Sequence, residues 1–549
     1  MKHRELAEAP IEEAEPWSNL LSKNQIVLTM AGIMLALFLA SLDQTVVTTA
    51  LPQIVSDLGG FSKLTWVTSS YLVASTTVVP ITGRLTDIYG RKKFFVGGVL
   101  VLLIGSVLSG QSETMNQLII FRAIQGLGGG IIMAITFVTI GDLFAPEDRG
   151  RYMGFLTAVF GITSLIGPTL GGFITDVLSW QWIFYINVPL GVLILVVLVR
   201  YFPDFEPAGS KERVDLWGLM FLILTVVPLM IGLSWAGYQY PWISVQVLGL
   251  IIVSLVFGLS FILVEIRSQS PLIPLTLFRN RNVSCSMAAV FLTGFVMFAS
   301  PVFIPLFFQG VLGRSATSSG SFLTPMMMAI VLGAALSGQL MSSRFSKKYR
   351  LLGLVGLGLM GVGTFLVSTV GPDTEYLVVI SFLGVNGFGL GITLPLFTLI
   401  VLNSIPIRLM GVAGSTVQFF RTIGGIVGLS LLGSFFNNNF ASNVSNSTTS
   451  EIRGILGSGG LEALTNNSRL LIGSDANDIQ NYLVDLGTDI DLGISGQIVY
   501  ILKTALSSAI SETFIISTFV VALAMVVTIF LVPGPSIVGK GASKPDKRQ

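Results

Sequence analysis

The chain has 549 residues, of which 52% are hydrophobic and 11% are charged, and its formal net charge is +2. Soluble domains carry roughly a quarter charged residues, so this composition excludes an ordinary soluble protein and indicates an integral membrane protein. The one cysteine, Cys285, excludes an intramolecular disulfide, and the one histidine, His3, lies in a polar tail away from the apolar segments.

Uncharged apolar stretches of about 20 residues recur along the chain, and each is long enough to cross a hydrocarbon core of about 30 Å as a helix. We therefore expect an all-α polytopic membrane protein with fourteen transmembrane helices. Residues 1–25 mix acidic and basic side chains without an apolar core, and they do not resemble a cleaved signal peptide. In chain order, the expected spans are 26–50, 64–84, 94–111, 117–142, 152–174, 182–201, 215–237, 244–266, 283–308, 320–342, 351–371, 376–402, 410–436 and 511–533.

The basic residues predict the orientation of these spans. With the N-terminus inside, most of the 31 Lys and Arg fall in inner segments. The outer segments hold only Lys63, Arg314, Arg453, Arg469 and Lys503. Inner loops carry the excess of positive charge in membrane proteins, so both termini, including the tail 534–549, are expected to be cytoplasmic. The segment 437–500 is rich in Ser, Asn, Gly and Asp, and we expect it to be a loop on the outside.

An internal repeat divides the chain into two related halves. The segment "FRAIQGLGGG" at 121–130 aligns with "FLGVNGFGLG" at 382–391, with one Phe and three Gly in register. The aligned offset places spans 1 to 6 opposite spans 9 to 14 and leaves two spans between them. We therefore expect a 6+2+6 arrangement, with bundles over 26–201 and 282–533 and an inserted hairpin over 202–281. Parallel repeats of this kind are typical of secondary transporters, whose substrate site lies near the membrane midplane between the halves.

Asp43 stands inside the uncharged run that begins at Gln25. At 1.5 Å per residue it lies roughly 25 Å along the first span, in the outer half of the membrane. The fourth span runs inward and places Arg122 at a comparable depth. A lone charge at the bilayer centre costs about 2.5–3.5 kcal/mol, so two opposite charges at one level predict an ion pair or a shared aqueous cavity. A static structural pair is the alternative to a functional one.

The functional interpretation of this pair is proton coupling. An apolar setting favours the neutral form of a carboxyl group, and a nearby guanidinium favours the charged form, so a change of distance or hydration changes proton binding. Asp43 and Arg122 are therefore the predicted proton-coupling residues. Glu512, at the outer start of the last span, is the reserve proton site.

Three further polar residues are candidates for lining a substrate cavity. Gln125 and Asn386 occupy equivalent positions in the two repeats. Arg421 has no evident acidic partner, and in a cavity it would favour an anionic or amphipathic ligand group. The alternative for the two amides is hydrogen bonding between helices, and the alternative for Arg421 is capture by backbone carbonyls or water.

The motif "GRLTDIYGRKK" at 83–93 follows the second span on the inner side. It resembles the loop signature of the major facilitator superfamily, in which a Gly, an Asp, a second Gly and an Arg recur at this spacing. The resemblance implies that the loop acts as a cytoplasmic latch between the halves, formed here by Gly83, Asp87, Gly90 and Arg91. The second repeat lacks the acid at this place, so the latch role is not extended to it.

Other motifs are similar to those of one branch of this superfamily. The segment "FGITSLIGPTLGGF" resembles the helix motif of its proton-coupled antiporters, which implies export; close helix packing is the alternative. The residues of this motif are Gly161, Gly167, Pro168, Gly171 and Gly172. "LDQTVVTTALP" and "WQWIFYINVP" resemble signatures of the fourteen-span drug:proton antiporters, the group of quaternary-ammonium and hydrophobic-uncoupler exporters.

Together these features predict a proton-coupled antiporter that exports lipophilic or amphipathic compounds by alternating access. We expect it in the plasma (inner) membrane as a monomer, with protons, a small molecule and the lipid bilayer as its partners and no nucleic acid. No phosphate-binding loop occurs, and no cofactor or metal is expected. The alternatives are a transporter of a dedicated lipid or metabolite, and a membrane receptor or sensor; an enzyme is not expected.

Overall fold

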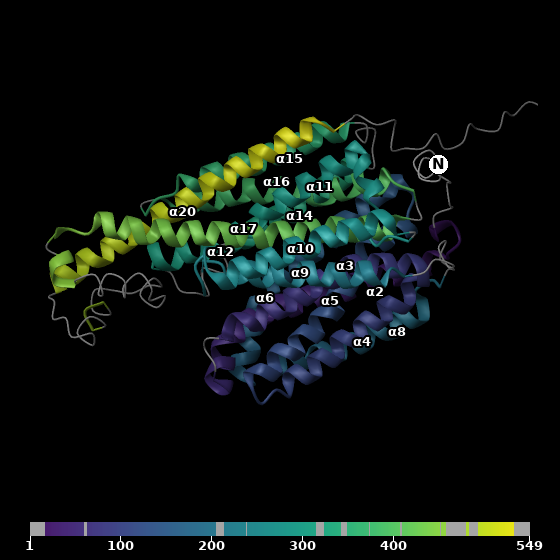
Figure 1. Ribbon diagram of the computed structural model, residues 1–549, viewed down its shortest axis with the longest axis horizontal. Helices are drawn as coiled ribbons and strands as arrows, with labels where there is room; N and C mark the ends of the chain where they lie inside the picture. The colour runs from purple at the N-terminus through teal and green to yellow at the C-terminus, as the bar shows by residue number, and fades with distance from the viewer. Residues whose placement is uncertain are drawn as a thin grey trace, which may run out of the picture.

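The computed structural model describes residues 17–59, 63–204, 214–237, 239–268, 270–313, 323–341, 348–372, 374–406, 409–450, 452–456, 479–481 and 492–531 (Figure 1). Within these ranges the regular structure is helical, apart from one isolated bridge between Ala236 and Tyr240. The expected tail 534–549 and most of the tail 1–25 lie outside the described residues.

The first of the two repeats forms a bundle within residues 17–201. Its helices are η1 (Trp17–Asn19), α2 (Lys23–Leu58), α3 (Leu64–Tyr89), α4 (Arg91–Gly110), α5 (Met115–Leu143), α6 (Pro146–Val177), α7 (Trp182–Tyr185) and α8 (Asn187–Tyr201). Polar residues start several of them: Ser22 and Gln25 form a capping box on α2, and Thr114 accepts a hydrogen bond from the backbone N–H of Gln117 on α5. We call this unit the N-half.

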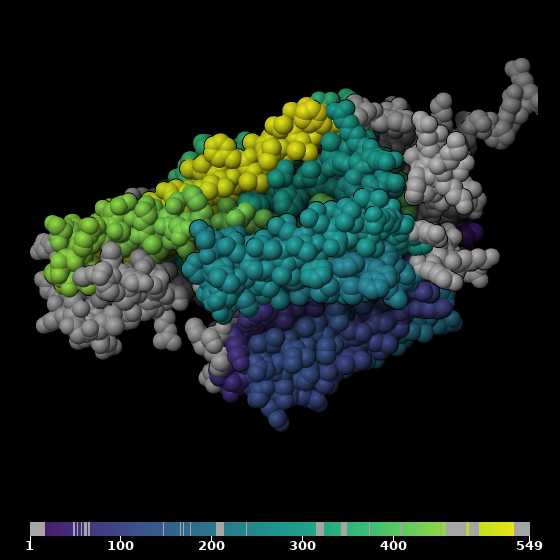
Figure 2. Space-filling view, viewed as in Figure 1, coloured from purple at the N-terminus to yellow at the C-terminus, as the bar shows by residue number. Residues whose placement is uncertain are grey.

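The hairpin and the second bundle follow. The hairpin consists of α9 (Leu216–Trp235) and α10 (Val245–Arg267). The second bundle, called the C-half, consists of η3 (Leu275–Arg279), α11 (Arg281–Met297), α12 (Ala299–Leu306), η4 (Phe307–Val311), α14 (Thr324–Met341), α15 (Tyr349–Ser368), α16 (Tyr376–Asn403), α17 (Met410–Ser447) and α20 (Leu492–Ile529). Figure 2 shows α9 and α10 covering one face of the molecule between the N-half and α17.

Thirteen helical segments of the described chain are long and apolar enough to cross a membrane. The helix α3, with 26 residues, joins them as a rod about 39 Å long at 1.5 Å per residue. Its many Ser and Thr residues lower its hydropathy below that of its neighbours. The predicted all-helical, multi-pass fold is therefore confirmed.

The glycines shared by the two repeats lie where helices touch. A Cβ added to Gly128 of α5 would lie 2.3 Å from the backbone nitrogen of Leu102 in α4. A Cβ added to Gly389 of α16 would lie 2.2 Å from the backbone nitrogen of Met360 in α15. The repeat detected in the sequence is therefore a repeat of helix contacts, in which only glycine permits the backbones to approach.

The halves meet closely where α3 and α6 of the N-half contact α17 and α14 of the C-half. A Cβ on Gly83 of α3 would lie 2.6 Å from the carbonyl oxygen of Gly411 in α17, and one on Gly338 of α14 would lie 2.2 Å from the carbonyl oxygen of Gly150 in α6. These two contacts join the helix pairs α3–α17 and α6–α14 across the boundary. The side chain of Arg149 adds a hydrogen bond of 2.7 Å to Asn403 at the end of α16.

The expected outer loop 437–500 needs correction at both ends. The helix α17 continues to Ser447, and α20 already begins at Leu492, so both helices extend beyond the rest of the bundle (Figure 1). Phe440 and Val444 of α17 are buried, as are Ile498 and Leu502 of α20. Each pair is spaced four residues apart and gives its helix an apolar stripe, which the polar composition of the segment concealed.

Candidate functional site

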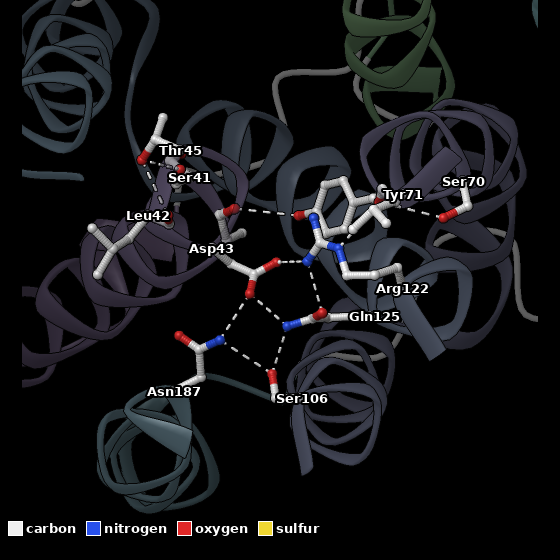
Figure 3. Close-up of polar contacts among 12 residues, drawn as sticks. Ser41, Leu42, Asp43, Thr45, Ser70, Tyr71, Ser106, Arg122, Gln125 and Asn187 are labelled. Carbon is white, nitrogen blue, oxygen red and sulfur yellow. Dashed lines mark hydrogen bonds and ion pairs between the residues drawn. The ribbon is translucent and has the colours of Figure 1, made fainter. Parts of the chain in front are cut away.

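A buried polar cluster surrounds Asp43 inside the N-half (Figure 3). The Nη1 of Arg122 donates to Oδ2 of Asp43 at 2.7 Å, and the two side chains are 1% and 0% exposed. The other carboxylate oxygen, Oδ1, accepts from Nε2 of Gln125 at 2.5 Å and from Nδ2 of Asn187 at 2.8 Å. Three donors from two helices, α5 and α8, therefore hold the carboxylate of α2.

The guanidinium of Arg122 is satisfied by more than the acid. Its Nη1 also donates to Oε1 of Gln125 at 2.7 Å, and its Nε donates to the carbonyl of Val67 at 3.4 Å. The ring of Tyr71 lies 4.5 Å from the guanidinium carbon, in cation–π geometry. The hydroxyl of Tyr71 donates to the carbonyl of Ala40 and so ties α3 to α2.

The backbone of this region explains why the side chains converge. Arg122 and Gln125 are three residues apart in α5, so their side chains share one face of the helix. A Cβ on Gly105 of α4 would lie 2.6 Å from the Cα of Gln125, so the glycine lets α4 approach closely. This approach brings the hydroxyl of Ser106 to 2.7 Å from Nε2 of Gln125.

The structure brings Asp43 and Arg122 together, as the matching depths predicted, and adds residues that the sequence argument missed. Asn187, Ser106 and Tyr71 were not among the candidates. The signal for Asn187 was an uncharged amide inside an apolar span, within the segment "WQWIFYINVP" that had already been singled out. Ser106 and Tyr71 carry no comparable signal, because hydroxyl residues are common in the spans of this chain.

The cluster combines one buried acid with groups that compensate its charge. It holds one carboxylate, one guanidinium and two amides that are all nearly inaccessible to solvent. A carboxylate removed from water stays charged only where a cation and hydrogen-bond donors compensate the lost hydration.

The loop motif at 83–93 forms a second polar cluster, where α3 ends and α4 begins. Oδ2 of Asp87 accepts from the backbone N–H of Val412 in the first turn of α17 at 3.1 Å, which is a contact between the halves. Arg91 donates to Oδ1 of Asp87 at 3.1 Å and also forms an ion pair with Asp142 of α5. Gly90 has a positive φ of 92° and ends α3 directly before α4.

The glycine motif of α6 has two kinds of contact and one open position. A Cβ on Gly161 would lie 2.5 Å from the side chain of Val331 in α14, across the boundary between the halves. A Cβ on Gly167 would lie 2.1 Å from Oγ1 of Thr45 in α2, within the N-half. Gly172 has no atom within 4 Å of such a Cβ. Gly171 is buried, and the side chain of Pro168 lies outside the described residues.

The remaining candidates do not gather at one place. Gln125 belongs to the Asp43 cluster, and its equivalent Asn386 donates to Oγ1 of Thr364 at 2.7 Å between α16 and α15. Both amides thus form interhelical hydrogen bonds, which was the alternative to lining a cavity. Glu512 accepts a hydrogen bond from Nδ2 of Asn439, in the contact between α20 and α17.

Arg421 is buried in the C-half at 8% exposure and pairs with no acid among the described side chains. It donates to Oε1 of Gln418, to the carbonyl of Leu394 and to Oγ1 of Thr398, at 3.0, 3.1 and 3.0 Å. Its Nε has no partner within the described residues. Three neutral acceptors therefore contact this charge, and one of them is a backbone carbonyl, as in the alternative to a cavity.

An apolar groove of about 350 Å³ lies between α3, α5 and α9. Its walls carry aliphatic side chains together with Trp66, Ser70 and Thr77. The ring of Trp66 also makes an edge-to-face contact with Trp235 at 5.8 Å between centroids. This volume lies at the lower end of the range for small-molecule sites.

An all-helical membrane protein of two repeated bundles, with paired charges buried in one of them, has the architecture of a membrane transporter. The model of the Major Facilitator Superfamily matches residues 33–429. "Multidrug resistance protein 3" of Bacillus subtilis (strain 168) is 38% identical over 500 residues, which cover 91% of this chain and 94% of the relative. "Multidrug transporter protein MdtP" of the same organism is 37% identical over 516 residues, covering 93% and 94%.

Among solved structures, the human organic anion transporter MFSD10 (TETRAN) matches with a TM-score of 0.57 at 13% identity, covering 90% of this chain and 99% of that one. The chain belongs to the major facilitator superfamily. It is a multi-pass membrane transporter related to multidrug resistance proteins. Membership in this family of transporters sets aside the receptor and enzyme alternatives.

Proposed function

We propose that this protein is a proton-coupled antiporter of the fourteen-span drug-exporting branch, which moves lipophilic or amphipathic compounds out of the cell. The observation that carries the proposal is the buried pair of Asp43 and Arg122, 2.7 Å apart in the N-half. Burying two charges costs more free energy than a pair of apolar side chains, so a purely structural role gives little reason to keep them. The names of the related multidrug proteins support export of small molecules.

The proposed mechanism alternates access between the two sides of the membrane. Asp43 takes up a proton from the outside, which neutralises the carboxylate and weakens its attraction to Arg122. The halves then rock, and the acid releases its proton to the inside. The cytoplasmic contacts of Asp87 with Val412 and of Arg149 with Asn403 would separate when the two halves move apart on the inner side. The latch motif therefore acts as one of the contacts that set the conformational equilibrium.

Arg421 and the apolar groove support the proposed class of substrate. A buried guanidinium with no acidic partner among the described residues favours a ligand with an anionic or strongly polar group. The groove between α3, α5 and α9 favours a lipophilic body. The same groove is the observation that favours the second candidate, a transporter of one dedicated lipid or metabolite on this fold.

The test is flux in proteoliposomes with an imposed pH difference. The protein should move a lipophilic substrate against its gradient when protons flow the other way. Asp43→Asn should abolish this coupled flux while the variant remains folded and inserted. Undiminished pH-dependent transport by Asp43→Asn would remove the acid from the mechanism.

A parallel pair of substrates separates the two candidates. An amphipathic dye with an anionic group and a fluorescently labelled lipid are offered to the same vesicles, and multidrug export predicts proton-driven flux of the dye. Flux of the lipid alone would favour the dedicated transporter. We place the protein in the plasma membrane with both termini cytoplasmic, and protease protection of tags at the two ends of the chain checks this orientation.

A further inference from the structure

Asn187 contacts the proposed proton site from α8, the last helix of the N-half. It is the first residue of α8 and is 1% exposed. Its Nδ2 donates to Oδ1 of Asp43 at 2.8 Å and to Oγ of Ser106 at 3.2 Å (Figure 3). The residue therefore touches both α2 and α4 through one amide group.

The position of Asn187 is fixed, because neighbouring side chains hold the start of α8 in place. The indole N–H of Trp180, just before α7, donates to Oδ2 of Asp57 near the outer end of α2 at 2.9 Å. The ring of Tyr185 packs over Gly110, where an added Cβ would lie 2.5 Å from the ring. Asn187 is thus presented to Asp43 by a segment that is anchored on α2 and on α4.

The charged groups around the carboxylate are few. Arg122 of α5 and Tyr71 of α3 are the titratable side chains that face Asp43 within the described part of the chain. The side chains of α4 and α8 that reach it or its partners are the uncharged Ser106 and Asn187. The contact with α6 runs through Thr45 and a backbone carbonyl. Apart from Arg122, no charged side chain among the described residues therefore masks the effect of losing a donor at Oδ1.

Both donors to Oδ1 are compatible only with a carboxylate oxygen that has no proton. A proton on Oδ1 would face the amide hydrogens of Gln125 and Asn187, so the acid takes up its proton either on Oδ2, when Arg122 moves away from it, or on Oδ1, when one amide turns its oxygen inward. The amide of Gln125 already accepts from Arg122, which fixes its orientation. Asn187 has no such second constraint from a charged group, and it is the amide that is free to respond.

We infer that Asn187 is a positioning residue of the proton site, which holds Asp43 in its charged form. The inference rests on the proposed function and adds a role for α8. A donor to a carboxylate favours the charged form, so its loss makes the acid hold a proton to higher pH. A hydrogen bond to a charged group corresponds to a shift of about one pH unit.

The experiment is an infrared titration of the full-length protein in lipid vesicles. The carboxyl band of Asp43 is identified by its disappearance in Asp43→Asn, and its midpoint is followed from acidic to alkaline pH. Asn187→Leu should raise the midpoint by about one pH unit. Asn187→Ser, whose hydroxyl keeps one donor, should shift it less, and transport should show the same order of pH dependence.

The matched control is Asn386→Leu, which removes a buried amide of the same kind in the C-half. It should leave the midpoint of Asp43 unchanged even where it lowers thermal stability. An unmoved midpoint in folded Asn187→Leu, or an equal shift in Asn386→Leu, overturns the inference. If Asn187→Leu does not fold, the titration of Asn187→Ala decides in the same way.

These outcomes are distinct from failure of the proposed function. If no band in the titration disappears in Asp43→Asn and that variant still couples transport to protons, the acid is not the proton carrier and both proposals fall. If Asp43→Asn loses coupling while Asn187→Leu titrates as the unmodified protein does, only the role of Asn187 falls.

Discussion

Removing one member of the Asp43–Arg122 pair should destabilise the protein far more than removing both. Arg122→Met leaves a carboxylate that is 0% exposed without its cation, and breaking a buried pair costs about 3–5 kcal/mol. The amides of Gln125 and Asn187 still donate to Oδ1, so we expect a loss near the lower value, about 3 kcal/mol. The double variant Asp43→Leu/Arg122→Met carries no charge at these two positions and should recover most of the lost stability.

These differences in stability are measured by unfolding the variants in detergent micelles with heat or denaturant. The loss in Arg122→Met should shrink as the pH falls, because protonation neutralises the stranded acid, whereas the double variant should show no such recovery. Equal destabilisation of the single and double variants, or a loss that does not change with pH, would refute the argument. The contribution of the pair to stability would then come from the packing of the two side chains and not from their charges.

Two further predictions concern glycines with opposite surroundings. Gly389→Ala should destabilise the C-half, because the added Cβ would lie 2.2 Å from a backbone atom of α15. Gly384→Ala in the same helix meets nothing within 4 Å and should be neutral or stabilising by up to about 1 kcal/mol. Thermal unfolding compares the two variants, and equal effects would contradict the contact. Gly83→Ala should push α3 from α17, where Ser415 lies 2.0 Å from the added Cβ, and lengthen the spin-label distance between their cytoplasmic ends. Gly97→Ala, with nothing within 4 Å, is its control, and an unchanged distance in Gly83→Ala would count against the latch.

The two halves share a framework but carry different charges. Gln125 and Asn386 lie at the same helix crossing, each directly against a glycine, Gly105 in α4 and Gly363 in α15. At these crossings the N-half holds a paired Asp and Arg, whereas the C-half has no acid among its described residues near the crossing. Arg421 of α17 lies against a later part of α16, where it donates to the carbonyl of Leu394 and to Oγ1 of Thr398.

The sequence predicted much of the fold and part of the site, and the reasons differ. Hydropathy identified the helices because a membrane forces every backbone polar group into a helix. Depth along a helix brought Asp43 and Arg122 to one level because the rise per residue is constant. Asn187 escaped prediction because its distance from Asp43 depends on how α7 and α8 pack, and no local pattern encodes that packing.

By itself, the sequence determined that this is a repeated all-helical membrane protein, because composition and periodic glycines follow directly from burial in lipid and from close helix contacts. The tertiary structure alone decided which polar groups meet. It placed Gln125 in the Asp43 cluster and Asn187 beside it, and it left Arg421 among neutral acceptors. Contacts such as Asp43–Gln125 and Asp43–Asn187 join residues 82 and 144 positions apart, and they depend on the rotation and tilt of whole helices, which only the packed bundle sets.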